Sequence, residues 1–373
     1  AIDQVFDQLL SQTTGDVFYC ADDEHALRIC SGRTRSISYG ESHLARYRFD
    51  DVHAKDFQSH FRVLRDGEPL GAVTLNVPGR HNVSNAVGVI ALASELGVQF
   101  SQIAEALSSF RGARRRFEIK HRSDQYMLVD DYGHHPSEVK ATLATAKGAG
   151  RKRVLCMFQP HRYTRTQKLK EEFGRAFHDA DPVVITDVYP ASEEPIPGIT
   201  GETLVQEVAR DGHDEVHYQP DRKKLALEVG RMMQPGDCIV TLGAGNIHEA
   251  ATALARDIGL LEQLQGAMGQ GVIKLYEPMS KHTTMRIGGP AQFWAEPETE
   301  ESFARLIRFT TEHGIPVTVI GRGSNLLVRD GGIRGAVVHL GRGEFKRVEV
   351  REGCIIAGAG VKQKELAYAA RDA

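Results

Sequence analysis

The chain has 373 residues, of which 41% are hydrophobic and 25% are charged, and its formal net charge is -3. At roughly 150 residues per domain, this length predicts two or three domains. The small net charge gives no attraction for nucleic acid or an anionic membrane, and no apolar run approaches the ~20 residues of a membrane span. We therefore expect a cytoplasmic protein with no nucleic-acid partner and no membrane span, whose oligomeric state the sequence leaves open.

The five cysteines are odd in number and scattered, and none forms a Cys-x-x-Cys pair. This pattern favours reduced thiols over a disulfide framework or a zinc site, so we predict no metal ligands in the chain. The chain opens without Met on a helical pattern and closes on another without a stop signal. We expect a segment of a longer protein, in which a site can be represented only in part.

Residues 1–110 combine short strands with one strong helical pattern. The expected strands are residues 17–20, 61–64 and 71–76. Apolar residues then recur at helical spacing from Val83 to Leu92, and a second short helix is expected over residues 101–110. Residues 111–262 instead alternate apolar strands with amphipathic helices, which predicts a mostly parallel sheet wrapped by helices. Its expected strands are residues 126–130, 153–158, 183–186, 215–218 and 238–242.

Residues 262–271 are polar and Gly-rich without periodicity, so we predict a linker over residues 263–275. A small α+β unit is expected over residues 276–373. Its strands are predicted at residues 318–320, 336–340 and 354–357, with a helix over residues 301–312. The predicted fold class of the whole chain is α/β.

Polar motifs follow three strands of the predicted parallel sheet, where ligands bind in such folds. They are DDYGHHP at residues 130–136, FQPHRYTRT at 158–166 and GAGN at 243–246. Carboxylates and imidazoles at a helix start suit a ribose diol and a polar or anionic group, and paired arginines suit a carboxylate or a phosphate. A polar helix-entry loop with Pro136 near the first helical position is the alternative reading of the first motif. Three such strand ends in one sheet favour a functional cleft.

These motifs, together with NVPGRHN at residues 76–82, Asn85 and RRFE at residues 115–118, resemble the Mur ligase family over about residues 1–262. The stretches HRYTRT and YG are most similar to the branch that adds L-alanine to UDP-N-acetylmuramate. The resemblance implies the C-terminal part of the central ATP-binding domain over residues 1–110. It implies a Rossmann-like C-terminal ligase domain over residues 111–262.

The resemblance also implies roles for seven side chains. Asn82 and Asn85 would contact adenine, and Arg116 and Asp131 the phosphates and ribose of ATP; the alternative for the two asparagines is helix capping. The remaining three, His134, Arg162 and Arg165, would hold the L-alanine carboxylate or the charge of an acyl phosphate.

No G-x-x-x-x-G-K-[ST] loop is present in the chain. The family places that phosphate-binding loop, and the ligands of Mg²⁺, upstream of the motifs found here. We therefore expect the Mg²⁺ ligands outside this chain and no turnover by the chain alone.

Residues 276–373 carry TTMRIGGPA at 283–291, GRGSNLL at 321–327 and GAG at 358–360. The Gly-x-Gly-Ser-Asn turn presents backbone amides that suit a pyrophosphate, although such a turn alone is more often a tight loop. The ordered set resembles the first FAD-binding subdomain of the UDP-N-acetylenolpyruvoylglucosamine reductase family, here incomplete. FAD, NADPH and the enolpyruvoyl substrate are implied for the complete reductase. The FAD contacts implied are Arg286, Ile287, Gly288, Gly289, Gly321, Arg322, Gly323, Ser324 and Asn325, of which Arg322 departs from the small or acidic residue expected.

Two alternatives remain open. The first is the related ligase that attaches an intact peptide to the same sugar nucleotide for recycling. The second, from a different class, is a non-catalytic nucleotide-binding scaffold. A phosphate-binding loop upstream of this chain would favour an enzyme over a scaffold. For an enzyme that joins the two families, the product of the reductase would be the substrate of the ligase.

Overall fold

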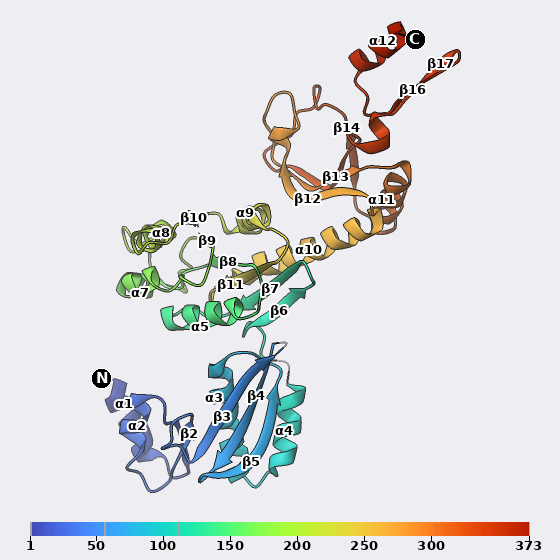
Figure 1. Cartoon of the computed structure of the whole chain (residues 1–373). Coiled ribbons are helices and arrows are strands. Elements are labelled where there is room, and N and C mark those ends of the chain that lie inside the picture. Colours follow the sequence, from blue (N-terminus) through green and yellow to red (C-terminus); the bar gives the residue numbers. More distant parts are fainter. Residues whose placement is uncertain (1, 56, 111, 373) are drawn as a thin grey trace.

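The computed structural model describes residues 2–55, 57–110 and 112–372, arranged as three successive units along an elongated molecule (Figure 1). The expected limits at residues 1, 111 and 373 lie outside the described residues. None of the described helices is long and apolar enough to cross a membrane. The five cysteines are free thiols.

The first unit is built on a five-stranded sheet in the order β1-β2-β3-β4-β5. The pairs β1–β2 and β2–β3 are parallel, and β3–β4 and β4–β5 are antiparallel. Its strands are β1 (Val17–Cys20), β2 (Ser36–Gly40), β3 (Tyr47–Lys55), β4 (Gln58–Arg65) and β5 (Glu68–Leu75). Its helices are α1 (Ile2–Gln12), α2 (Glu24–Cys30), α3 (Arg80–Glu95) and α4 (Phe100–Ser109). Helix α3 buries Val83, Val87 and Ile90 against the sheet, at the helical spacing that predicted it.

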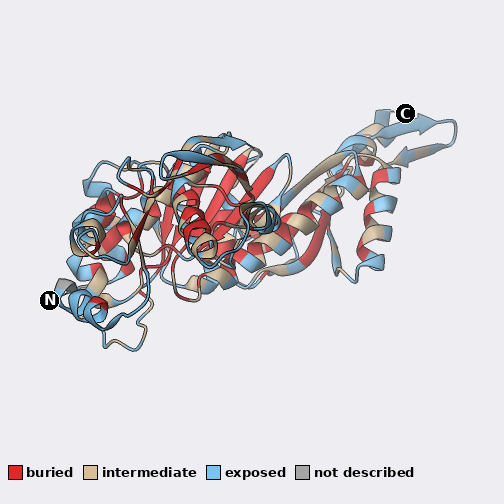
Figure 2. Cartoon of the chain, turned by 90° about the horizontal axis from the view of Figure 1, so that it is seen from below, coloured by how far each residue is buried: buried red, intermediate tan, exposed pale blue. Residues whose placement is uncertain are grey.

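The second unit has a six-stranded sheet in the order β10-β9-β8-β11-β7-β6. All its pairs are parallel except β6–β7, at one edge. The strands are β6 (Glu118–Arg122), β7 (Tyr126–Asp131), β8 (Arg153–Phe158), β9 (Val183–Ile185), β10 (Val216–Tyr218) and β11 (Asp237–Leu242). The helices are α5 (Pro136–Lys147), α6 (Tyr163–Lys168), α7 (Lys170–Gly174), α8 (Gly201–Arg210), η1 (Arg222–Lys224), α9 (Leu225–Met232) and α10 (His248–Met268). Strands β7, β8 and β11 are buried or nearly so along their length, as expected for a sheet covered on both faces (Figure 2).

The third unit has a four-stranded sheet in the order β12-β13-β15-β14 and a separate hairpin of β16 and β17. Its strands are β12 (Gly271–Pro278), β13 (Pro290–Pro297), β14 (Val317–Ile320), β15 (Ile333–His339), β16 (Val348–Arg351) and β17 (Cys354–Ala357). Its helices are η2 (Met279–Lys281), α11 (Glu300–Glu312), η3 (Gly343–Lys346) and α12 (Gln363–Asp372). The hairpin and α12 protrude and are largely exposed (Figure 2).

The predicted mixed α/β fold with a mostly parallel second sheet is confirmed, but the linker predicted over residues 263–275 is wrong. Helix α10 continues to Met268, and β12 begins at Gly271. Leu261, Leu264 and Met268 lie on one face of α10 and are buried. The glycines and glutamines between them hide this apolar spacing in the sequence. The division of the chain into four parts otherwise stays a prediction.

Candidate functional site

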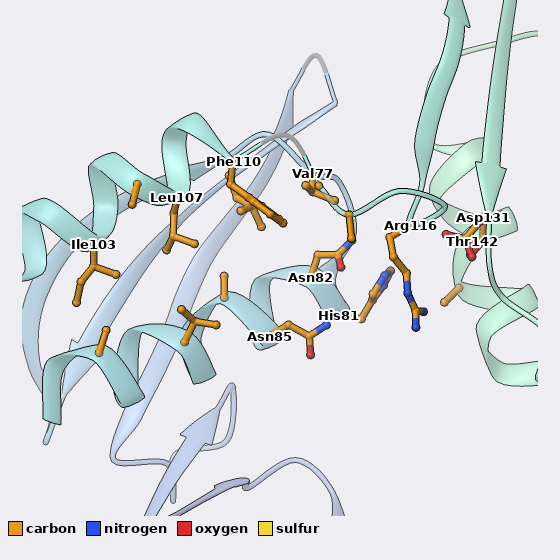
Figure 3. Close-up of a pocket in the computed structure, with 18 of the residues that line it drawn as sticks. Val77, His81, Asn82, Asn85, Ile103, Leu107, Phe110, Arg116, Asp131 and Thr142 are labelled. Atoms are coloured by element: carbon orange, nitrogen blue, oxygen red, sulfur yellow. The ribbon is translucent and has the colours of Figure 1, made fainter. Parts of the chain in front are cut away.

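A cavity of about 980 Å³ lies where the first and second units meet. Figure 3 shows residues of α3 and α4 on one side of it and Arg116, Asp131 and Thr142 on the other. The wall from the first unit is largely apolar, with Val77, Ile103, Leu107 and Phe110 among its residues. An apolar wall facing charged groups suits a ligand with a flat apolar part and a polar or anionic part.

Asn82 and Asn85 both line this cavity from the first turns of α3. Gly79, with a φ of 104°, is the residue that precedes α3, so neither asparagine caps the helix. The side-chain amide of Asn82 donates to the carbonyl of Pro78 at 2.7 Å. This bond orients the Asn82 side chain, and the position of Gly79 as N-cap rules out the capping alternative for both asparagines.

Arg116 and Asp131 reach the same cavity from the second unit. Asp131 is only 7% exposed, and its two carboxylate oxygens accept hydrogen bonds from the amides of Phe117 and Gly133, both at 2.7 Å. Those bonds hold the carboxylate in one orientation at the end of β7. The four residues predicted to contact one nucleotide are thus brought together around one cavity.

His134 follows β7, and Arg162 and Arg165 follow β8; these strands lie on either side of β11, and His161 links the group. The ring of His134 lies 5.4 Å from that of His161, which stacks on Tyr189 at 5.6 Å. Arg165 Nη1 is 3.3 Å from His161 Nδ1. Arg162 is more distant from this group, since its exposed guanidinium faces Glu193 at 4.0 Å.

His161 is neutral at physiological pH. Burial, the largest cause, together with the neighbouring His134 and Arg165 lowers its pKa to about 4. A neutral imidazole beside a guanidinium pairs a hydrogen-bond acceptor with a cation. This arrangement suits an amino acid, whose carboxylate would bind Arg165 and whose amine would face His161.

Three further residues of the site were missed by the sequence analysis. His81 lines the cavity next to Asn82, and partial burial lowers its pKa. Tyr132 contacts both the ring of His134, at 5.4 Å, and the guanidinium of Arg116, at 5.6 Å. His161 and Tyr132 were visible inside the quoted motifs. Only the fold shows that both of their rings lie next to the ring of His134.

The glycine motifs of the third unit also contact one another. The amide of Thr284 donates to the carbonyl of Gly323 at 3.2 Å, and Thr283 Oγ1 donates to Ile287 at 2.8 Å. Gly323 has a φ of 61°, and a Cβ there would lie 2.2 Å from the carbonyl of His282, so only glycine fits. Arg286 and Gly288 also have positive φ, and a Cβ at Gly289 would lie 2.0 Å from the carbonyl of Asp330.

The turn at residues 321–325 is open. Gly321, Arg322, Ser324 and Asn325 are exposed, and within the described part of the chain the amides of residues 322–325 donate no hydrogen bond. Free amides in a tight turn fit a pyrophosphate, so the geometry is compatible with the diphosphate of FAD. Arg322 adds a positive charge at that turn.

No metal site fits the described residues, since no group of three or more His, Cys, Asp or Glu side chains among them lies close enough to hold an ion.

Comparisons with known proteins match three domain families in order. They are the Mur ligase middle domain over residues 2–93, the Mur ligase glutamate ligase domain over residues 115–245 and a FAD binding domain over residues 291–373. The three matched ranges correspond to the three units of the fold.

Curated relatives include UDP-N-acetylmuramate--L-alanine ligases. The protein from Anaeromyxobacter sp. is 47% identical over 229 residues, 61% of this chain and 49% of that protein. The protein from Syntrophotalea carbinolica is 43% identical over 243 residues, 65% of this chain and 53% of that protein. The chain therefore spans about half the length of these relatives.

Among solved structures, the UDP-N-acetylmuramate-alanine ligase of Thermotoga maritima is 26% identical, with a TM-score of 0.56 over 69% of this chain and 54% of that one. A MurF ligase of Thermotoga maritima, solved in complex with ADP, has a TM-score of 0.51 at 14% identity over 66% of this chain and 55% of that one, which supports the fold alone.

Proposed function

The chain contains the middle and glutamate ligase domains of the Mur ligase family followed by a FAD binding domain, and from this premise we propose that it belongs to a cytoplasmic enzyme of peptidoglycan precursor synthesis. The proposed reaction joins L-alanine to UDP-N-acetylmuramate with ATP. The observation that carries the proposal is the convergence of Asn82, Asn85, Arg116 and Asp131 on one cavity, beside the His161 and Arg165 pair.

In the proposed reaction, the terminal phosphoryl group of ATP passes to the muramate carboxylate, and the amine of L-alanine displaces phosphate from the acyl phosphate. The apolar wall near Ile103 and Phe110 receives the adenine, whose polar edge meets Asn82 and Asn85. Asp131 accepts from the ribose hydroxyls, and Arg116 offsets phosphate charge. Mg²⁺ would be held by residues other than those described here.

The loop and helix that follow β8 receive the amino acid. Arg165 binds its carboxylate, and His134 borders the same group of rings. His161 accepts from Arg165 through Nδ1 and stays neutral, and the adjacent Arg165 cation favours the uncharged, nucleophilic form of the amine, since an ammonium carries no lone pair for attack. Arg162 is more exposed than Arg165 and contributes a positive charge at the edge of the proposed amino-acid site.

The third unit is proposed to hold the diphosphate of FAD at residues 321–325, with residues 286–289 beside it. FAD would supply hydride transfer from NADPH to UDP-N-acetylenolpyruvoylglucosamine in a complete reductase. Reduction of that substrate yields UDP-N-acetylmuramate, so the two activities would be consecutive.

The test is phosphate release from ATP by the complete gene product that contains residues 1–373, with Mg²⁺ and UDP-N-acetylmuramate. We expect release that depends on L-alanine, and an increase of about 100-fold in the KM for L-alanine on Arg165→Gln, since a charge-assisted bond of roughly 3 kcal/mol is lost. Arg175→Gln, an exposed change on the same unit, is the matched control.

Two other results would contradict the proposal. Phosphate release that requires an intact peptide in place of L-alanine would favour the recycling ligase. Nucleotide binding without phosphate release under any of these conditions would favour the scaffold.

A further inference from the structure

Arg115 lies directly before Arg116 and contacts two other motifs, those at residues 130–136 and 243–246. Its carbonyl accepts a hydrogen bond from the amide of Tyr132 at 2.7 Å, and its guanidinium donates to the carbonyl of Gly243. The same guanidinium lies 5.0 Å from the centre of the Tyr132 ring and 3.5 Å from a carboxylate oxygen of Asp130. Yet neither Arg115 nor Asp130 lines the cavity.

Asp130 is fully buried, and neither of its carboxylate oxygens has a hydrogen-bond partner in the described part of the chain. Thr241, its neighbour across the β7–β11 ladder, also has a buried hydroxyl without a partner there. Burial raises the pKa of Asp130, and the Arg115 guanidinium opposes that rise. A buried carboxylate with so few hydrogen bonds destabilises a fold unless a charge compensates it, and Arg115 is the cation placed to do so.

The backbone that carries these arginines is strained. Arg115 has a φ of 58° and Phe117 a φ of 48°, in the left-handed region that costs non-glycine residues about 1 kcal/mol or more each. The bonds that hold this conformation come from β7, through the Tyr132 amide and the Asp131 carboxylate. Arg116 and Asp131 therefore line the cavity, and the ion pair of Arg115 with Asp130 lies behind them.

We propose that Arg115, paired with Asp130, is a positioning residue that fixes the Arg116 guanidinium at the nucleotide cavity through the Tyr132 ring, which both guanidiniums contact. The inference rests on the proposed nucleotide site and extends it, since Arg115 acts on the ligand through Arg116. Its distinguishing consequence is non-additivity, because a residue that acts through another has no effect once that other is removed.

The test is a double-mutant cycle on ADP binding, measured by titration calorimetry with the complete gene product. We expect Arg115→Met to weaken binding about tenfold, a loss of roughly 1.4 kcal/mol, and Arg116→Met to weaken it at least as much. The double variant should bind as Arg116→Met does, within about twofold. Losses that multiply would overturn the proposal.

Arg114→Met is the matched control, since it removes the same charge from an exposed neighbour and should leave ADP affinity unchanged within about twofold. If Arg115→Met fails to fold, the pair Arg115→Met with Asp130→Asn removes both charges and leaves no uncompensated carboxylate. The proposal expects this pair to show the same tenfold loss, and wild-type affinity would overturn it.

A ligand-free crystal structure of the Arg115→Met variant separates this inference from the proposed function. The inference expects Arg116 to leave its place at the cavity, and an unmoved Arg116 would overturn it whether or not ADP binds. Failure of the wild-type protein to bind ADP would instead reject the proposed nucleotide site.

Discussion

The two junctions between the three units differ in kind. The first and second units are joined by the segment before β6, touch where Phe57 lies 4.6 Å from Arg122, and enclose the cavity between them. The second and third units instead share one hydrophobic core, which runs from Ile239 of β11 through α10 to Phe293 of β13. The first junction leaves space for a ligand, whereas the second is packed with buried apolar side chains.

The second junction is also closed by polar contacts. Tyr276 of β12 packs against Gly230 of α9, where a Cβ would lie 2.5 Å from its ring. Its hydroxyl donates to the buried carboxylate of Asp257 at 2.6 Å, and Gln292 donates to the same carboxylate at 3.2 Å. A shared core with satisfied polar groups indicates that the second and third units unfold together, whereas the first is free to unfold separately.

The largest expected effect comes from a cavity in the shared core. Ile239→Ala removes a fully buried side chain from the ligase sheet and should destabilise both units by about 2 to 5 kcal/mol. Trp294, the single tryptophan, is buried in the third unit, so its fluorescence reports unfolding of that unit alone. We expect the urea midpoint of the Trp294 signal to fall in the Ile239→Ala variant.

Ile90→Ala is the matched control for this change. Ile90 is also fully buried, but it belongs to the separate core of the first unit. It should destabilise that unit by a similar amount, seen by circular dichroism, and leave the Trp294 midpoint unchanged. A fall in the Trp294 midpoint with Ile90→Ala, or none with Ile239→Ala, would contradict the contrast between the junctions.

A smaller effect is expected from the polar contact at the second junction. Tyr276→Phe leaves the Asp257 carboxylate with one hydrogen bond fewer in a buried site and should cost about 1 to 2 kcal/mol. The same Trp294 midpoint measures it. Tyr368→Phe, on exposed α12, should leave the midpoint in place. An unchanged midpoint in Tyr276→Phe would show that packing alone closes this junction.

The smallest effect concerns the open site beside the first junction. His161 should titrate at a pH of about 4 in a ¹H–¹⁵N NMR pH series, well below the ordinary value of about 6.5. Because its folded pKa lies below its unfolded pKa, its contribution to stability is complete above pH 6.5 and is lost as the pH falls toward 4. Arg165→Gln removes a nearby cation and should raise the titration midpoint. A midpoint near 6.5 in the unsubstituted protein would contradict the burial argument.

Local patterns predicted those parts of the fold that depend on sequence spacing alone. Helix α3 follows from the apolar residues between Val83 and Ala91, and strand β8 from an unbroken apolar run. Strand β3 was missed because its polar residues, such as Asp50 and Asp51, obscure the alternation that buries Tyr47 and Phe49.

The candidate site was predictable only in part. Its charged residues follow strand ends, and that rule located Asp131 and Arg165. The contacts among the rings of Tyr132, His134 and His161 depend on the distance between the loops that follow β7 and β8. The spacing of these residues along the chain does not give that distance. The same holds for Arg115, which precedes β6, because its partners Asp130 and Gly243 lie at the ends of β7 and β11.

Helix α10 runs unbroken out of the second unit, and this makes the phase of the helix a constraint on the fused chain. One residue inserted near Gly259 would rotate everything downstream by about 100° and advance it by about 1.5 Å. The Tyr276 ring would then no longer pack against Gly230. A flexible linker would absorb such an insertion at almost no energetic cost. In this chain, the rigid helix makes the number of residues between the two units decisive, because that number sets their relative rotation.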